Sequence, residues 1–184
     1  MSEDDGLITA ALRHAAALHE GTYRPDRART PFVSHLSETA ELVRHAGGTP
    51  AEVAAAWLHD AVEDGLTTVD ELAGLFGEEV AGLVAAVSDA PEDVGRAIGE
   101  RKALQAIRLA AAPDGAKRIK LAEQISILQA LAVERPLSWS VERADAYVEG
   151  SRLVAAACAA ASPQLAERYA AVAALAGAPA GAPA

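Results

Sequence analysis

The sequence has 184 residues, of which 51% are hydrophobic and 23% charged, so its length and composition fit one globular domain that folds without disulfides or structural metals. Its net charge of −10 argues against a duplex nucleic-acid binder, which needs a basic face to neutralise phosphates. A local basic pocket for a small anion is still compatible with this charge.

Helical periodicity, punctuated by Gly and Pro, dominates the chain. No run of alternating β-branched residues indicates a sheet. The first helix is expected at 7–21, followed by an arginine-containing loop at 22–30 and a second helix at 31–47. A third helix follows Thr49 and Pro50, an N-cap with Pro at the first helical position, and runs through "AWLHDAVED".

The remaining sequence continues the helical pattern. Thr68 and Glu71 form a capping box at the start of a short helix. Further helices are expected at 67–77, 78–90, 92–112, 115–134, 138–161 and 163–177. We therefore predict an all-α bundle of about eight to ten helices, formed as one domain over residues 1–175, with residues 176–184 as a flexible Ala/Gly/Pro tail.

The N-terminus and the single cysteine indicate the cellular compartment. The first ten residues, "MSEDDGLITA", are acidic and lack the basic region and the apolar run of a signal peptide. No apolar stretch is both long and charge-free enough to span a bilayer. Cys158 has no partner for an intramolecular disulfide, which suits a reducing compartment. We expect a cytoplasmic protein.

The stretch "AAAWLHDAVEDGLTT" places a histidine and three carboxylates at the predicted end of the third helix. His59 and Glu63 are four residues apart, as are Asp60 and Asp64, so each pair shares one helix face. Carboxylates at a helix C-terminus are unfavourable, by about 0.3 to 1 kcal/mol each, unless a cation offsets them. Imidazole with carboxylate suits Mn, Fe or Zn. The alternative interpretation is a solvated acidic helix end that carries a surface histidine.

Two further polar residues occur in apolar helical surroundings. His35 lies in "PFVSHLSETA" and Glu123 lies in "IKLAEQISIL", where a buried carboxylate needs a partner. A hydrogen-bonded core histidine and a salt bridge from Glu123 to a neighbouring lysine of its own helix are the alternatives without a metal. Grouped with His59 and Asp60, the two residues predict one metal site.

A series of motifs carries a family resemblance. In chain order they are "HEGTYR", "TPFVSH", "AAWLHDAVED", "LFGEEVAGLV", "ERKALQ", "AKRIKLAE" and "WSVERADAY". Together they resemble the HD-domain hydrolases of the Rel/Spo family, specifically the stand-alone small alarmone hydrolases, over roughly residues 7–175. The resemblance implies an all-helical HD fold, a bound Mn ion with Fe or Zn as alternatives, and release of the 3′-pyrophosphate of (p)ppGpp by a metal-activated water.

The resemblance also implies roles for individual residues. The metal ligands that it implies are His35, His59, Asp60 and Glu123. The acidic pair that activates the attacking water and handles protons is Glu63 and Asp64. The substrate-binding residues are Arg24, Lys102, Arg143 and Tyr147. A guanidinium can hold a phosphate with two hydrogen bonds, and a tyrosine ring or hydroxyl can contact the nucleoside.

Several positions depart from the family pattern. Glu123 replaces an aspartate, which moves the carboxylate by about one bond length. Ile127 replaces an asparagine that contacts the substrate, and isoleucine can neither donate nor accept a hydrogen bond. Pro25 and Gln124 each replace a basic residue of the family.

These departures leave the acidic pair intact, which favours a working hydrolase. They keep open a shifted substrate, such as an adenosine alarmone or a 2′- or 3′-phosphorylated nucleotide like NADPH. A further alternative is a non-catalytic HD domain that binds a nucleotide or a protein, because fold resemblance alone does not establish chemistry. The expected partner is a nucleotide, with no nucleic acid and no membrane, and the oligomeric state stays open.

Overall fold

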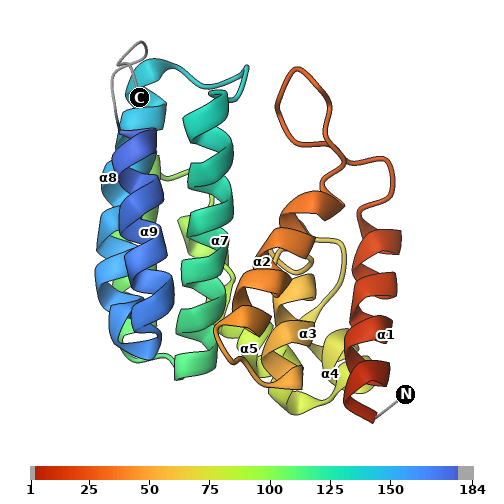
Figure 1. Ribbon diagram of the computed structural model, residues 1–184. Coiled ribbons are helices and arrows are strands. Elements are labelled where there is room, and N and C mark those ends of the chain that lie inside the picture. Colours follow the sequence, from red (N-terminus) through yellow and green to blue (C-terminus); the bar gives the residue numbers. More distant parts are fainter. Residues whose placement is uncertain (1–2, 178–184) are drawn as a thin grey trace.

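The computed structural model describes residues 3–177, and the regular elements of this part of the chain are helices (Figure 1). The α-helices are α1 Glu3–Leu18, α2 Val33–His45, α3 Pro50–Leu58, α4 Val69–Phe76, α5 Glu78–Val87, α6 Ile98–Ala110, α7 Asp114–Val133, α8 Val141–Cys158 and α9 Pro163–Ala176. The short 3-10 helices are η1 Pro91–Asp93 and η2 Ala159–Ala161. The predicted all-α bundle is confirmed.

Helix α7 is the central element of the bundle. It contacts α2, α3, α5, α8 and α9, and in Figure 1 it lies between the group formed by α1 to α5 and the pair α8 and α9. Helix α6 packs against α8. Residues 119–126, in the middle of α7, are all buried. Because this stretch has no solvent-facing stripe, its polar side chains must find partners inside the protein.

Helix α3 brings the acidic motif into the interior. It contacts α1, α2, α5 and α7, and the alanines 54–56 in its middle are fully buried. Small side chains at such contacts let the surrounding helices approach closely. The residues that follow α3 therefore start inside the bundle, next to α2 and α7.

The capping signals predicted from the sequence are confirmed. Thr49 Oγ1 accepts a hydrogen bond from the Glu52 N–H at 3.2 Å, and Pro50 is the first residue of α3. At the start of α4, the Glu71 N–H donates to Thr68 Oγ1 at 3.2 Å and the Thr68 N–H donates to Glu71 Oε2 at 3.0 Å. These bonds satisfy N–H groups that have no partner within the helix.

The predicted end of the third helix is wrong. Helix α3 ends at Leu58, and residues 59–65 form consecutive turns instead of continuing the helix. The ring Nδ1 of His59 lies 2.8 Å from the Ala56 carbonyl oxygen, which would accept the next helical hydrogen bond. The next backbone hydrogen bond spans three residues instead of four, from the Ala61 N–H to the Leu58 carbonyl at 3.0 Å.

The helix predicted over 92–112 also begins later than expected. Its first residue is Ile98, and the segment before it contains η1 and a turn. Gly95 has φ of +88°, whereas an α-helix requires φ of about −63°, so the helix cannot extend through it. The buried Asp93 accepts from Arg108 at 2.5 Å and joins this connection to α6.

The last predicted helix is confirmed as α9, which ends at Ala176. The expected flexible tail at 176–184 lies outside the described residues from residue 178 onward. Over residues 3–177, none of the helices combines the length and the apolar character needed to cross a membrane.

Candidate metal centre and active site

Three ligand atoms converge where α2 meets the turn after α3. His59 Nε2 lies 3.2 Å from His35 Nε2 and 3.2 Å from Asp60 Oδ2, and the distance from His35 Nε2 to Asp60 Oδ2 is 3.5 Å. Bonds of about 2.0 to 2.2 Å to one ion place neighbouring ligand atoms about 3 to 3.5 Å apart. His35, His59 and Asp60 therefore form a candidate site for a divalent metal ion.

The orientation of the two imidazole rings also suits a metal. His59 Nδ1 lies 2.8 Å from the Ala56 carbonyl, which only accepts hydrogen bonds, so Nδ1 carries the proton. In the neutral ring this leaves a lone pair on Nε2, directed at His35 and Asp60. His35 likewise holds its Nδ1 away from the site, 2.8 Å from Ser126 Oγ. Facing lone pairs repel each other unless a cation lies between them.

The charges around the histidines favour a cation. Burial by itself lowers the pKa of His59, but the charge and hydrogen bond of Asp60 and the charge of Glu123 outweigh it and raise this pKa to about 9. Burial would raise the pKa of Asp60, but His59 and His35 hold it well below its usual range. A proton and a metal ion therefore compete for His59 Nε2, because a ligand nitrogen must be deprotonated.

Glu123 is buried on α7 but is not part of this group of ligand atoms. Its Oε2 lies 2.6 Å from Lys120 Nζ, and its Oε1 accepts from Gln124 Nε2 at 3.0 Å. Lys120 also donates to the Val87 carbonyl at 3.0 Å. The salt bridge to a lysine of the same helix is thus present, and the role of Glu123 as a fourth ligand stays a prediction.

The acidic pair Glu63 and Asp64 lies in the turn after α3, in two different environments. Glu63 is open to solvent but lies inside a cavity. Partial burial there raises the pKa of its carboxyl. The charge of Lys120 opposes this shift, and nearby carboxylates reinforce it. The Asp89 N–H donates to Glu63 Oε2 at 3.2 Å. Asp64 Oδ2 lies 3.5 Å from Nε2 of the buried His19. A carboxyl with a raised pKa suits proton uptake near neutral pH.

A cavity of about 820 Å³ opens beside the metal candidates, a size typical of small-molecule sites. Its walls come from the 22–31 loop, α2, the turn after α3, α6, α7, the connection before α8, and α8 itself. One part of the wall carries Asp60 and Glu63, and another part is apolar, with Ile127, Leu131 and Trp139. The cavity therefore combines a charged end with an apolar surface.

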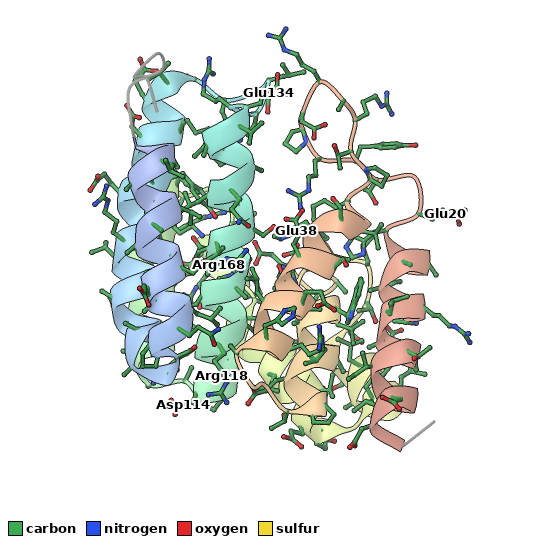
Figure 2. The ribbon with its side chains drawn as sticks, in the orientation of Figure 1. Glu20, Glu38, Asp114, Arg118, Glu134 and Arg168 are labelled. Atoms are coloured by element: carbon green, nitrogen blue, oxygen red, sulfur yellow. The ribbon has the colours of Figure 1, made fainter. Side chains whose placement is uncertain are left out.

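Arg24 lines this cavity from the loop between α1 and α2. Its Nε donates to Ser34 Oγ at 3.0 Å, and its Nη2 donates to Glu38 Oε2 at 2.7 Å and to Ser126 Oγ at 3.4 Å. Figure 2 shows Glu38 between α2 and α7. The predicted phosphate-binding arginine thus reaches the cavity already paired with a carboxylate.

The same loop is tied to the end of α7, and Pro25 and Glu134 from these two segments both line the cavity. Arg27 Nε lies 2.8 Å from Glu134 Oε1, and the Leu137 N–H donates to the Pro25 carbonyl at 3.1 Å. Glu134 and the tip of the loop lie close together in Figure 2. These contacts hold the loop that carries Arg24 against the end of α7.

Lys102 and Tyr147 meet at the inner wall, where α6 packs on α8. Lys102 Nζ lies 4.6 Å from the centre of the Tyr147 ring and donates to Gln105 Oε1 at 3.1 Å. Burial and the neighbouring Lys120 lower the pKa of Lys102 to about 8 against the opposing effect of nearby carboxylates. The Tyr147 hydroxyl donates to Gln124 Oε1 at 3.2 Å. Both predicted residues line the cavity.

Arg143 is not among the residues that line the cavity. It is exposed in the first turn of α8, and its guanidinium lies 5.1 Å from the centre of the Trp139 ring. Trp139 itself lines the cavity and packs on Tyr147, with ring centres 5.2 Å apart. Arg143 therefore packs on a residue of the cavity wall without lining the cavity itself, and its contact with the substrate stays a prediction.

Three residues that the sequence interpretation did not assign contact this region. Glu38 follows His35 by three positions on α2, a spacing that places both on one helix face and was a usable signal. Ser126 is fully buried in the middle of α7, and its hydrogen-bond partners come from distant segments that only folding brings next to it. His19 packs its ring on Phe32, with ring centres 5.1 Å apart, and nothing local in the sequence pairs it with Asp64.

The sequence profile of the HD domain matches residues 11–149. A guanosine-3′,5′-bis(diphosphate) 3′-pyrophosphohydrolase, MESH1, of Xenopus tropicalis is 36% identical over 151 residues, which cover 81% of this chain and 83% of the relative. The human protein of the same name is 35% identical over 151 residues, with the same shares covered.

Solved structures are also similar. One, described as a metazoan orthologue of SpoT that hydrolyses ppGpp, superposes with a TM-score of 0.83 at 30% identity and covers 90% of this chain and 93% of that chain. A second, from Listeria monocytogenes, has a TM-score of 0.63 at 26% identity and covers 76% of this chain and 95% of that chain. The chain therefore belongs to the HD-domain family, among the stand-alone small alarmone hydrolases.

Proposed function

We propose that this protein is a metal-dependent phosphohydrolase that releases pyrophosphate from the 3′ position of guanosine-3′,5′-bis(diphosphate) and related alarmones. The observation that carries the proposal is the convergence of His35, His59 and Asp60 within 4.8 Å beside a cavity of about 820 Å³. The relatives named for this activity support the choice of reaction.

Manganese is the proposed metal, with iron and zinc as alternatives, because two imidazoles and a carboxylate suit these ions. His35, His59 and Asp60 would hold it, and Glu123 is the proposed further ligand. A divalent ion in this position supplies the Lewis acidity that makes water nucleophilic at neutral pH.

Glu63 is proposed to take the proton from the attacking water, since its pKa is raised and its carboxylate is accessible in the cavity. Asp64 is proposed to assist this proton transfer, so that the proton taken from water ends on the 3′ oxygen that the reaction releases. It differs from Glu63 by facing His19, whose pKa is raised because Asp64 and the Ala15 carbonyl outweigh the effect of burial.

The cavity suits a nucleotide that carries phosphates at one end. Arg24 and Lys102 are the proposed phosphate contacts because both line the cavity and carry positive charge near neutral pH. Tyr147, Trp139 and Ile127 are proposed to contact the nucleoside on the apolar side. Arg143, which packs on Trp139, is proposed to contact the substrate from beside this residue.

The experiment that tests this function combines metal analysis with product analysis. Purified protein is assayed for bound metal, and the same preparation is then given guanosine-3′,5′-bis(diphosphate) with added Mn²⁺. We expect about one metal per chain and release of pyrophosphate. Metal without release would redirect the search to other nucleotides. Absence of both metal and release would favour the non-catalytic HD domain.

A shifted substrate is the second candidate, and two features of the cavity favour it. Ile127 lines the cavity where a hydrogen-bonding asparagine is expected, and Arg24 is already paired with Glu38 at 2.7 Å. A site without these polar contacts loses discrimination for the group they would bind. Steady-state rates on guanosine and adenosine alarmones and on NADPH test this candidate, and a clear preference for the guanosine alarmone would contradict it.

A further inference from the structure

Ser126 joins the candidate metal centre to the substrate arginine. It is fully buried on α7, and its hydroxyl contacts side chains from two other elements of the fold. The distances from Oγ are 2.5 Å to Glu38 Oε2, 2.8 Å to His35 Nδ1 and 3.4 Å to Arg24 Nη2. His35 and Glu38 come from α2, and Arg24 comes from the loop that precedes it.

Counting hydrogens assigns the direction of each of these bonds. A serine hydroxyl has one hydrogen to donate and two lone pairs that accept. The ionised carboxylate of Glu38 only accepts, so the hydroxyl hydrogen of Ser126 points to it. Arg24 only donates, and the remaining lone pair therefore faces His35. His35 Nδ1 must carry a proton and donate to Ser126.

This bond determines what His35 presents to the metal site. A neutral ring that is protonated on Nδ1 has its lone pair on Nε2, the atom that lies 3.2 Å from His59 Nε2 and 3.5 Å from Asp60 Oδ2. The opposite tautomer would direct an N–H at the metal position. His59 obtains the same tautomer from the backbone carbonyl of Ala56, whereas His35 depends on a side chain.

We infer that Ser126, with its hydroxyl oriented by Glu38, is a positioning residue that holds His35 in its metal-binding tautomer. The inference rests on the proposed function, since it concerns the metal that His35, His59 and Asp60 would hold. Partners of this kind, which hydrogen-bond a ligand histidine, typically affect metal affinity 10- to 100-fold. Glu38 Oε2 accepts from both Ser126 and Arg24, so one carboxylate orients the residue next to the metal ligand His35 and the proposed phosphate contact.

The test compares variants at two serines. Ser126→Ala removes the hydroxyl that accepts from His35. Ser34→Ala is the matched control, because Ser34 Oγ also accepts from Arg24, at 3.0 Å, but no hydrogen bond joins it to His35. Titration of metal-free protein with Mn²⁺ is expected to show a Kd raised about 10- to 100-fold for Ser126→Ala and unchanged for Ser34→Ala. Ser126→Thr, which keeps the hydroxyl, is expected to restore most of the affinity.

A second measurement does not depend on metal. Long-range ¹H–¹⁵N spectra of the metal-free protein, recorded at a pH at which the His35 and His59 rings are both neutral, report which nitrogen of His35 is protonated. The wild type and Ser34→Ala are expected to show the proton on Nδ1, and Ser126→Ala is expected to lose this preference. Circular dichroism of each variant checks that the fold is retained.

The outcomes separate this inference from the proposed function. Equal Mn²⁺ affinity and an unchanged His35 tautomer in a folded Ser126→Ala variant would overturn the positioning role alone. A wild-type protein that binds no Mn²⁺, Fe²⁺ or Zn²⁺ would overturn the metal centre and this inference with it.

Discussion

Adjacent carboxylates in one turn need not do the same work, and Glu63 and Asp64 illustrate this at the scale of single residues. Glu63 opens into the cavity among other carboxylates and has a raised pKa. Asp64 faces His19 at 3.5 Å. Two neighbouring carboxyls in unlike environments can take different roles in one reaction.

The proposed base role of Glu63 predicts the behaviour of Glu63→Gln. The amide has nearly the same shape but cannot accept a proton as a carboxylate does, so kcat is expected to fall about 10²- to 10⁴-fold. Bound Mn is expected to stay unchanged, because Glu63 is not in the group of candidate ligand atoms. His59→Ala is the comparison that should lose metal and activity together. Loss of metal from Glu63→Gln would contradict the base role.

Arg24→Ala tests the proposed phosphate contact. Removing the guanidinium takes away a charge that lines the cavity but leaves His35, His59 and Asp60 in place. We expect KM to rise about tenfold, equivalent to about 1.4 kcal/mol of binding, with a smaller effect on kcat. Mn²⁺ titration serves as the control and should be unaltered, whereas an unchanged KM would count against the contact.

At the scale of elements, the packing of α6 on α8 positions Lys102. Gly150 on α8 lies so close that a Cβ built on it would meet Lys102 Cβ at 2.6 Å and Cγ at 2.9 Å. Only a residue without a side chain allows the stem of Lys102 to lie against α8. The lysine head group then reaches the Tyr147 ring at the cavity wall.

Gly150→Ala is expected to separate α6 from α8 and displace Lys102. Overpacking of this kind costs typically about 1 to 3 kcal/mol of unfolding free energy, and KM should rise as the lysine moves. Gly82→Ala is the matched control, since Gly82 is exposed in α5 and, apart from the adjacent backbone of its own helix, no atom lies within 4 Å of a Cβ added there. That variant is expected to gain up to about 1 kcal/mol. Denaturant unfolding and KM measure both effects, and equal stability of the two variants would refute the packing argument.

The pKa of Lys102 predicts a pH dependence of substrate binding. Because this pKa is lowered from 10.5 to about 8, the side chain is charged below pH 8 and increasingly neutral above it. The attraction to phosphate is therefore present at lower pH and lost as pH rises through about 8. We expect KM, measured at saturating Mn²⁺, to increase above this pH. Lys102→Met should show a high KM without that increase, and a persistent rise would assign the dependence to another group.

At the scale of the whole molecule, the candidate metal centre connects elements that are distant in sequence. His35 lies on α2, His59 and Asp60 follow α3, and Ser126 on α7 contacts His35 from the central helix. An ion that bridges these elements would bind the native state and find no preformed site in the unfolded chain. Metal affinity and global stability should consequently be linked.

Thermal unfolding tests this linkage. Mn²⁺ at about 100 times its Kd is expected to add about 2.7 kcal/mol, which for a chain of this size raises Tm by about 5 to 11 °C. A chelator should reverse the shift. His59→Ala is expected to unfold at a temperature that Mn²⁺ does not change, and a shift of similar size in that variant would place the stabilising ion elsewhere.

The sequence by itself determined the features that depend on local spacing. The all-α class, the caps at Thr49 and Thr68, and the grouping of His59 with Asp60 all follow from residues within one or two helical turns of each other. The order of the motifs was sufficient to indicate the HD-domain family. These features survive folding because neighbours along a helix stay neighbours in the structure.

Tertiary structure alone decided which polar groups from different elements are paired with each other in the site. The partner of Arg24 is Glu38, 14 residues away, and His35 bonds to Ser126, 91 residues away. Such contacts are set by how helices far apart in sequence pack together. No local pattern encodes these contacts. They determine the tautomer of His35, which charges are paired in the site, and which side of the site is open to the cavity.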